Sequence, residues 1–273
     1  MPARLCRLTV PLLLALAPAM AMAQPPEPVA TAAQGAVMPM PLHDAWTSLL
    51  QTYVRPGADG VNRVDYAALK ASPADRAALD AYIAGFADMD LSGDSPAEFA
   101  AWANLYNAVT VRYIVEKYPL GSIRDGYLFG GPWKKITVAA DGRVVSLDEI
   151  EHRILRPRFH DPRVHYAINC ASYSCPNLPL KAWEAGTLDA GLDAAARDYI
   201  NSPRGVTVID RGLVLSGIYD WFRTDFGGSK QAVIDHLLRY ADPDLAAAIR
   251  ANPTIRGYEY DWSLNDIQKA EVK

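Results

Sequence analysis

Two cysteines five positions apart are the residues of this sequence best suited to chemistry. Cys170 and Cys175 lie in the stretch RVHYAINCASYSCPNLP, where a short apolar run meets a loop broken by prolines. A thiol at its ordinary pKa of about 8.5 is mostly protonated at neutral pH, so it needs a neighbouring imidazole to become a nucleophile. The first hypothesis is a cysteine-dependent enzyme with Cys170 as nucleophile, because Cys170 directly follows the apolar run.

A general base would have to accompany that nucleophile, and His152 is the candidate. It lies off the apolar face of the helix predicted for LDEIEHRILR, so its ring is free to face a cleft. Glu151, Asn104 or Asn107 could fix its tautomer, as in Cys-His-Asn sites. The structural alternative for the two asparagines is that they bond to loop backbone, since an unpaired buried amide costs roughly 1–3 kcal/mol.

Two other interpretations of the cysteines stay open. In an oxidising compartment Cys170 and Cys175 would form a disulfide, leaving a ligand-binding domain without catalytic thiols. A redox-regulated enzyme would combine the nucleophile and the disulfide hypotheses: Cys175 would block Cys170 in a disulfide until that bond is reduced. A zinc site would add His165 and either His152 or His160, but the spacing matches no structural zinc pattern. We therefore predict neither a metal nor another cofactor.

Aromatic and polar residues near these positions are the candidate substrate-binding residues: Trp102, Tyr106, Trp133, Tyr173, Ser174, Tyr219 and Trp221. The segment 121–131, rich in glycine and aromatic residues, is a candidate pocket wall or lid. The structural alternative for Tyr219 and Trp221 is that they belong to the core with Phe222 and Phe226, because aromatic residues at helical spacing commonly do.

The remaining histidines have structural explanations. The apolar run Val164–Ile168 predicts a buried strand, and His165 within it is expected to be a hydrogen-bonded structural residue. His43, His160 and His236 are expected at the surface or at helix ends.

Helices dominate the predicted secondary structure. The longest runs from Ser95 to Tyr118, begins with a capping box of Ser95 and Glu98, and is apolar nearly all round, which predicts burial. Hairpins are predicted at 135–146 and 205–216, each turned by residues that include glycine. Runs of helices with a few hairpins indicate an α+β domain, mostly helical, with a small antiparallel sheet.

The N-terminus predicts export. Basic residues, the apolar run Leu8–Ala19 and Ala-Met-Ala before Gln24 are typical of a secretory signal peptide. We expect residues 1–23 to be the signal peptide, 24–41 a flexible leader rich in proline and alanine, and 42–273 a single domain. The expected location is periplasmic or secreted.

Charge and hydropathy limit the partners. The 273 residues carry a net charge of −4, which argues against nucleic-acid binding because that needs a positive field. Apart from the signal, no apolar run is long enough for a membrane span. A small-molecule or peptide ligand remains the expected partner, and the sequence does not indicate an oligomeric state.

Several motifs, in order along the chain, resemble the domain-of-unknown-function-547 family. Trp102–Asn107 stands for the family's FWxNxYN block, Glu151-His152 for its EH pair, and Cys170–Pro176 for its CxxxSCP block. A GG-x-W-x-K hairpin opening and a late YDWFRTDFGG also match, so the resemblance spans about Ala45 to Tyr240.

The resemblance implies a set of Asn, His and Cys blocks like those of papain-like peptidases and transglutaminases, which is an analogy at the level of the fold. It also favours Cys170 over Cys175 as nucleophile, because the family pattern admits serine at the second position. On this basis we expect a cysteine hydrolase or acyltransferase acting on an amide bond in a peptide or a peptidoglycan fragment. The alternative is a non-catalytic binding module with a Cys170–Cys175 disulfide.

Overall fold

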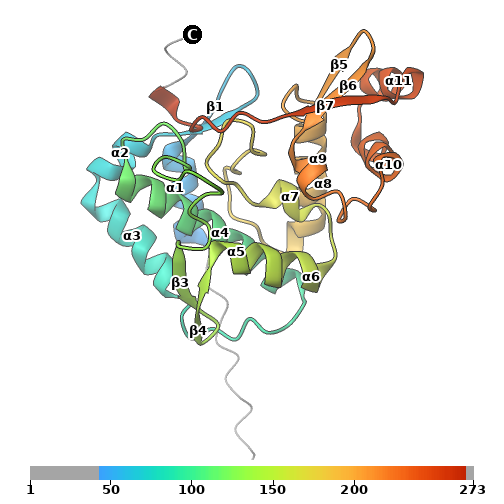
Figure 1. Cartoon of the computed structure of the whole chain (residues 1–273). Coiled ribbons are helices and arrows are strands. Elements are labelled where there is room, and N and C mark those ends of the chain that lie inside the picture. Colours follow the sequence, from blue (N-terminus) through green and yellow to red (C-terminus); the bar gives the residue numbers. More distant parts are fainter. Residues whose placement is uncertain (1–42, 269–273) are drawn as a thin grey trace, which may run out of the picture. The chain divides into compact units, whose positions relative to one another are not determined.

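The computed structural model describes residues 43–268, so the predicted signal peptide and the whole predicted leader lie outside the described residues (Figure 1). Within this range the α+β class is confirmed, with helices predominating and strands in small sheets. No helix in the described range combines the length and apolar character that crossing a bilayer requires.

The elements follow one another along the chain without long repeats. The first are α1 (Asp44–Tyr53), β1 (Val54–Pro56), β2 (Asn62–Val64), α2 (Tyr66–Ala71), α3 (Pro73–Ala84), α4 (Pro96–Lys117), β3 (Thr137–Ala140) and β4 (Arg143–Ser146). The middle part has α5 (Leu147–Glu149), a π-helical turn (Ile150–Leu155), α6 (Arg156–Phe159), α7 (Val164–Ala167), a 3-10 turn (Ala185–Thr187) and α8 (Leu188–Ile200). The last are β5 (Val206–Ile209), β6 (Gly212–Ser216), α9 (Ile218–Trp221), α10 (Lys230–Tyr240), α11 (Pro243–Ala251) and β7 (Ile255–Glu259).

The strands pair locally, except for the last. Strands β1 and β2, β3 and β4, and β5 and β6 form antiparallel pairs, whereas β7 returns to pair parallel with β6. The predicted turn between β3 and β4 is confirmed at Asp141 and Gly142, whose φ angles of 54° and 68° suit a tight hairpin. The β6–β7 pairing brings the end of the described chain back across the molecule.

Helix α4 is the centre of the larger core. Ser95 and Glu98 form the predicted capping box, and Pro96 occupies the first turn. Helices α2 and α3 pack against it, and α1 packs on α3. Its buried residues include the unbroken run from Phe99 to Val111, so it is buried nearly all round, as the sequence predicted. A second cluster of buried apolar residues joins α8, α10, α11 and the β5–β6–β7 sheet.

The predicted strand Val164–Ile168 is wrong. The chain there forms the short helix α7, entered through a turn in which the amides of Val164 and His165 donate to Asp161 and Pro162 carbonyls. Because this segment is buried on all sides, its apolar run carries no periodicity, and such a run cannot distinguish a short helix from a strand.

The helix predicted for LDEIEHRILR contains an irregularity that its sequence does not reveal. Ser146 and Glu149 cap it as predicted, but the six residues Ile150–Leu155 form a π-helical turn between α5 and α6. Such turns are rare and often occur at functional sites because they shift side chains out of α-helical register. This turn contains Glu151 and His152.

Candidate functional site

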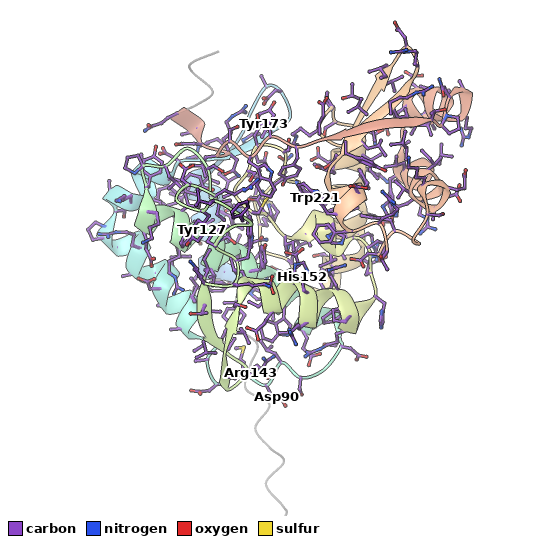
Figure 2. The ribbon with its side chains drawn as sticks, in the orientation of Figure 1. Asp90, Tyr127, Arg143, His152, Tyr173 and Trp221 are labelled. Atoms are coloured by element: carbon purple, nitrogen blue, oxygen red, sulfur yellow. A yellow bond between two sulfur atoms is a disulfide. The ribbon has the colours of Figure 1, made fainter. Side chains whose placement is uncertain are left out.

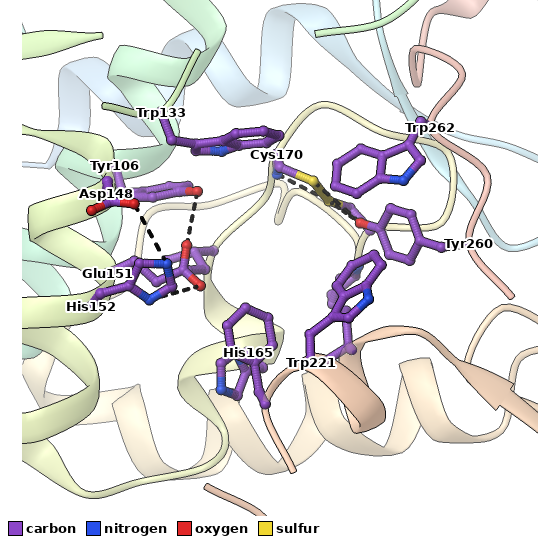
Figure 3. Close-up of a pocket in the computed structure, with 15 residues that line it drawn as sticks. Tyr106, Trp133, Asp148, Glu151, His152, His165, Cys170, Trp221, Tyr260 and Trp262 are labelled. Carbon is purple, nitrogen blue, oxygen red and sulfur yellow. Dashed lines mark hydrogen bonds and ion pairs between the residues drawn. A yellow bond between two sulfur atoms is a disulfide. The ribbon is translucent and has the colours of Figure 1, made fainter. Parts of the chain in front are cut away.

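A pocket of about 200 Å³ lies between three parts of the chain (Figure 3). These are the π-helical turn, the loop that contains Cys170 and Cys175, which we call the cysteine loop, and the C-terminal segment after β7, which contains Tyr260 and Trp262. Its lining is rich in aromatic rings and has few polar groups, a composition typical of ligand sites. The lining residues are Tyr106, Trp133, Asp148, Glu151, His152, His165, Ile168, Cys170, Cys175, Pro176, Ile218, Trp221, Phe222, Tyr260 and Trp262.

One side of the pocket, which we call the carboxylate wall, consists of Tyr106, Asp148, Glu151 and His152 (Figure 3). The Tyr106 hydroxyl donates to Glu151 Oε2 at 3.3 Å. His152 lies 4.0 Å from Glu151 Oε1 and 3.9 Å from Asp148 Oδ1, in both cases measured from a ring nitrogen. The π-helical turn thus places a carboxyl group and an imidazole side by side.

Glu151 has an unusual acidity for a carboxyl group. Burial raises its pKa to about 7, while the charge of Arg156 and the hydrogen bond from Tyr106 act in the opposite direction. Only 8% of the residue is exposed, so removal from water dominates. A carboxyl group with this pKa exchanges its proton readily near neutral pH.

His152 is exposed at the pocket, but the lone pair of its ring already accepts a hydrogen bond. Arg156 Nη1 lies 2.8 Å from His152 Nδ1, and because a guanidinium only donates, this nitrogen must accept. The other nitrogen then carries the proton of the neutral ring. Burial, followed by the charge of Arg156, lowers the pKa of His152. In this arrangement, His152 has no free lone pair with which to accept a thiol proton.

His165 is the better-oriented imidazole. Its Nε2 donates to Asp225 Oδ2 at 2.7 Å, and its ring stacks on Phe222 with centroids 4.1 Å apart. Arg156 binds the same carboxylate through two nitrogens, at 2.5 and 3.0 Å. Burial lowers the pKa of His165, while the hydrogen bond to Asp225 acts in the opposite direction. The expectation of a hydrogen-bonded structural histidine is met, and the residue also lines the pocket.

The opposite side, the sulfur wall, consists of Cys170, Cys175, Tyr260, Trp221 and Trp262 (Figure 3). The two cysteines form a disulfide, the pairing that the second interpretation expected. The Tyr260 hydroxyl lies 3.2 Å from the Cys170 sulfur and 3.0 Å from the Cys175 sulfur. A disulfide sulfur has no proton, so the hydroxyl is the donor in both contacts. As a disulfide, Cys170 has no thiol to act as nucleophile.

The two asparagines of α4 bind backbone, as their structural alternative predicted. Asn104 exchanges two hydrogen bonds of 2.9 Å with the backbone of Trp183. Asn107 donates to the Ala167 carbonyl at 2.9 Å and accepts from the Asn169 amide at 2.8 Å. Asn107 thereby fixes the segment that leads into Cys170, which makes it a positioning residue.

Aromatic rings of the pocket come from three distant parts of the chain. Trp262 packs against Trp133 at 5.7 Å, Trp221 at 5.5 Å and Tyr260 at 4.6 Å between ring centroids. Trp221 is 49% exposed, unusual for so large an apolar ring, and stands at α9 across from His152 of the π-helical turn (Figures 2 and 3). An exposed tryptophan beside a pocket offers a surface on which a ligand can stack.

The predicted binding residues divide into three groups. Tyr106, Trp133 and Trp221 line the pocket. Trp102 and Tyr219 are fully buried, the first donating to the Leu91 carbonyl and the second packed in the smaller core cluster.

Tyr173 and Ser174 line a separate hollow beside Arg204. The expectation for His236 is wrong, because it is buried and bonds the Tyr166 hydroxyl at 2.8 Å. Its position on the inner face of α10 explains this burial.

Sequence reasoning missed Asp225, Tyr260 and Trp262 as site residues. In the sequence, Asp225 is only one acidic residue within a cluster of aromatic residues. The run Gly257–Trp262 alternates like a strand, and its aromatic residues were the available signal. In fact β7 ends at Glu259, so Tyr260 and Trp262 lie in the irregular segment that reaches the pocket. Among the described residues no cluster of His, Cys, Asp or Glu is arranged to hold a metal ion.

Comparison with known families supports the resemblance. Residues 92–200 match the model of a family described as "Protein of unknown function, DUF547". Over these residues the chain is similar to that family, a shorter span than the resemblance over Ala45–Tyr240 that the motifs indicated. No curated protein and no solved structure matches the chain.

The matched segment contains the whole carboxylate wall, both cysteines and several other lining residues, but it ends before the last part of the pocket. Trp221, Tyr260 and Trp262 follow the segment in sequence, as does Asp225. The cleft is therefore assembled from the family segment and from the part of the chain that comes after it.

Proposed function

We propose that the chain is an exported ligand-binding domain whose pocket takes a small ring-bearing molecule, or a side chain of a peptide, that carries an amine. The observation that carries this proposal is the disulfide in the pocket: the candidate nucleophile is committed to Cys175, while aromatic rings and carboxyl groups converge on the same cavity.

The size and lining of the pocket support a ring-bearing ligand. An apolar cavity of about 150 Å³ is known to hold benzene, so about 200 Å³ accommodates a ring with a short arm. Trp221 and Trp262 offer faces on which such a ring can stack. The pocket is too small for more than one such group, so a peptide would insert one side chain and leave the remainder outside.

The carboxylate wall supports an amine at the end of that arm. An ammonium group beside Glu151 and Asp148 would favour the ionised form of Glu151, whose pKa burial raises to about 7. Binding would then release a proton from Glu151, and affinity would increase with pH through neutrality. Aromatic rings also attract cations through their faces.

The test is titration of the tryptophan fluorescence with three matched probes. Phenethylamine, 2-phenylethanol and phenylacetate share the ring and differ in the charge of the arm. We expect the amine to bind most tightly, the alcohol less tightly and the carboxylate least. Binding of none of the three, or tightest binding of the carboxylate, contradicts the proposal.

The matched variants are Trp221→Ala and Val208→Ala. Both residues are about half exposed, at 49% and 48%, but only Trp221 lines the pocket. We expect Trp221→Ala to weaken phenethylamine binding by about tenfold, in keeping with loss of one stacked aromatic contact. Val208→Ala should leave the affinity unchanged.

A cysteine hydrolase or acyltransferase that becomes active on reduction is the second candidate. It is supported by the presence of Cys170 and two histidines in one pocket, and of these His165 is oriented by Asp225 as catalytic histidines are. The test is release of a chromophore from amide substrates after reduction. Activity that Cys170→Ser and His165→Ala both abolish would replace the binding proposal with this one.

A further inference from the structure

The Cys170–Cys175 disulfide faces a pocket, and its two sulfurs have different surroundings. Cys170 is half-buried, whereas Cys175 is only 3% exposed. A disulfide is broken by a thiolate that attacks one sulfur and expels the other. A thiolate entering the pocket therefore reaches the Cys170 sulfur and expels the Cys175 sulfur.

The Cys175 sulfur is placed to leave as a thiolate. It accepts a hydrogen bond from the Cys170 backbone amide at 3.0 Å and another from the Tyr260 hydroxyl at 3.0 Å. Burial raises the pKa of Tyr260 well above its usual range, so this hydroxyl stays protonated and keeps donating. Hydrogen bonds to the charged form lower a thiol's pKa, and a thiol of lower pKa leaves faster.

The loop around the disulfide is held by hydrogen bonds that do not involve sulfur. The Asn169 side chain accepts from the Ala171 amide and donates to the Pro176 carbonyl, each at 2.7 Å. The Ser174 carbonyl accepts from the Tyr199 hydroxyl at 2.7 Å, and its amide donates to the Asp261 carbonyl at 3.1 Å. Opening the disulfide therefore leaves the loop and the pocket in place.

Ala171, inside the disulfide ring, has a left-handed backbone with φ of 60°. This conformation is uncommon for a residue with a Cβ and persists only where its surroundings enforce it. Here the Asn169 side chain enforces it through the Ala171 amide. The left-handed residue and its bond to Asn169 fix the backbone between the two cysteines, independently of the sulfurs.

We propose that this disulfide is an exchange centre that oxidises thiol-bearing molecules entering the pocket. A ligand thiolate forms a bond to Cys170 Sγ, the bond between the cysteines breaks, and its electron pair goes to Cys175 Sγ. A second ligand thiolate then attacks the ligand sulfur of the mixed disulfide and expels Cys170 as a thiolate. Two ligand thiols become one disulfide, and their two electrons and two protons end on Cys170 and Cys175.

This activity goes beyond ligand binding and does not depend on the amine preference proposed above. The first experiment exposes the oxidised protein to reduced glutathione in native buffer, stops the reaction with acid and N-ethylmaleimide, and maps the adducts by mass spectrometry. We expect glutathione on Cys170 and maleimide on Cys175. Glutathione on Cys175, or reduction only in denaturant, overturns the proposal.

The second experiment removes the Tyr260 hydroxyl, which donates a hydrogen bond to the leaving sulfur of Cys175. Tyr260→Phe should slow reduction by glutathione about fivefold, the equivalent of one net hydrogen bond. Tyr258→Phe is the matched control, because the Tyr258 hydroxyl is buried near the same segment without a hydrogen-bond partner. Equal rates for Tyr260→Phe and the unaltered protein overturn the role of Tyr260 and with it the proposed leaving-group stabilisation.

A third comparison keeps the proposal testable if Tyr260→Phe does not fold. The single-cysteine variants Cys175→Ser and Cys170→Ser are mixed with oxidised glutathione, which a free thiolate attacks. We expect the Cys170 thiol in Cys175→Ser to react at least about tenfold faster than the Cys175 thiol in Cys170→Ser, because accessibility governs exchange. Comparable rates contradict the difference between the two sulfurs.

Discussion

The two walls of the pocket are built by different means. Three residues of the carboxylate wall, Asp148, Glu151 and His152, come from one continuous segment, in which a capped helix changes to a π-helical turn. The fourth, Tyr106, joins them from α4. The sulfur wall is assembled from the cysteine loop, α9 and the C-terminal segment. The first offers a proton-exchanging group and the second an electron-accepting bond. Local sequence thus determines most of the carboxylate wall, and the long-range path of the chain determines the sulfur wall.

The largest effect is expected at Asp225, which holds both histidines of the pocket in place, one directly and one through Arg156. Asp225 binds Arg156, which holds His152, and also binds His165. Asp225→Ala leaves the buried His165 without its partner, so we expect it to lower the free energy of unfolding by about 3 kcal/mol in denaturant titrations.

The control for that prediction is Asp220→Ala. Asp220 pairs with Arg223 at the surface, and removing such a pair changes stability by less than about 1 kcal/mol. Equal losses for the two variants would show that Asp225 contributes no more than a surface ion pair.

A pH experiment isolates the carboxylate wall. Because the pKa of Glu151 is about 7 when folded and near 4.5 when unfolded, the folded protein holds the proton more tightly. Its contribution to stability is complete below pH 4.5 and is lost as pH increases through 7, a change on the order of 3 kcal/mol. In the Glu151→Gln variant, the free energy of unfolding should no longer show this decline as the pH increases. An unchanged slope in the variant contradicts the assignment.

A matched pair of asparagine variants isolates the sulfur wall. Asn107→Ala and Asn104→Ala each remove two hydrogen bonds to buried backbone, so both should cost about 2 kcal/mol. Only Asn107 supports the approach to Cys170, so only Asn107→Ala should alter the rate of reduction by glutathione. Equal reduction rates in the two variants would remove the positioning role from Asn107.

A modest change in stability is expected from loss of the disulfide itself. The ring encloses only four intervening residues, and in the chain-entropy model so short a loop contributes no more than about 2 kcal/mol. The double variant with both cysteines replaced by serine should remain folded, with the melting temperature lowered by a few degrees. Unfolding of this variant at 25 °C would show that the loop depends on the sulfurs after all.

The sequence predicted local structure well where caps and turns are encoded by neighbouring residues. The capping box at Ser95 and the turn at Asp141 are examples. It failed at Val164–Ile168, because burial on every side removes the periodicity on which the distinction between helix and strand depends.

For the site, the sequence indicated the cysteines and Glu151, but not how they face each other. The pairing of His165 with Asp225 joins residues 60 positions apart, and no local pattern records such a contact. Tyr260 is 85 positions from Cys175 and enters the pocket only because β7 pairs with β6. Contacts of this kind depend on tertiary packing, which propensity and periodicity do not describe.

The C-terminal segment is also the last part of the pocket to be synthesised. During synthesis both cysteines leave the ribosome long before Tyr260 and Trp262 exist, so the thiols can be oxidised while the cavity still lacks one side. A polypeptide released after Glu259 would contain both cysteines and every residue of the carboxylate wall but would lack the hydroxyl that contacts both sulfurs. Maturation of this site therefore depends on the last part of the domain to be translated.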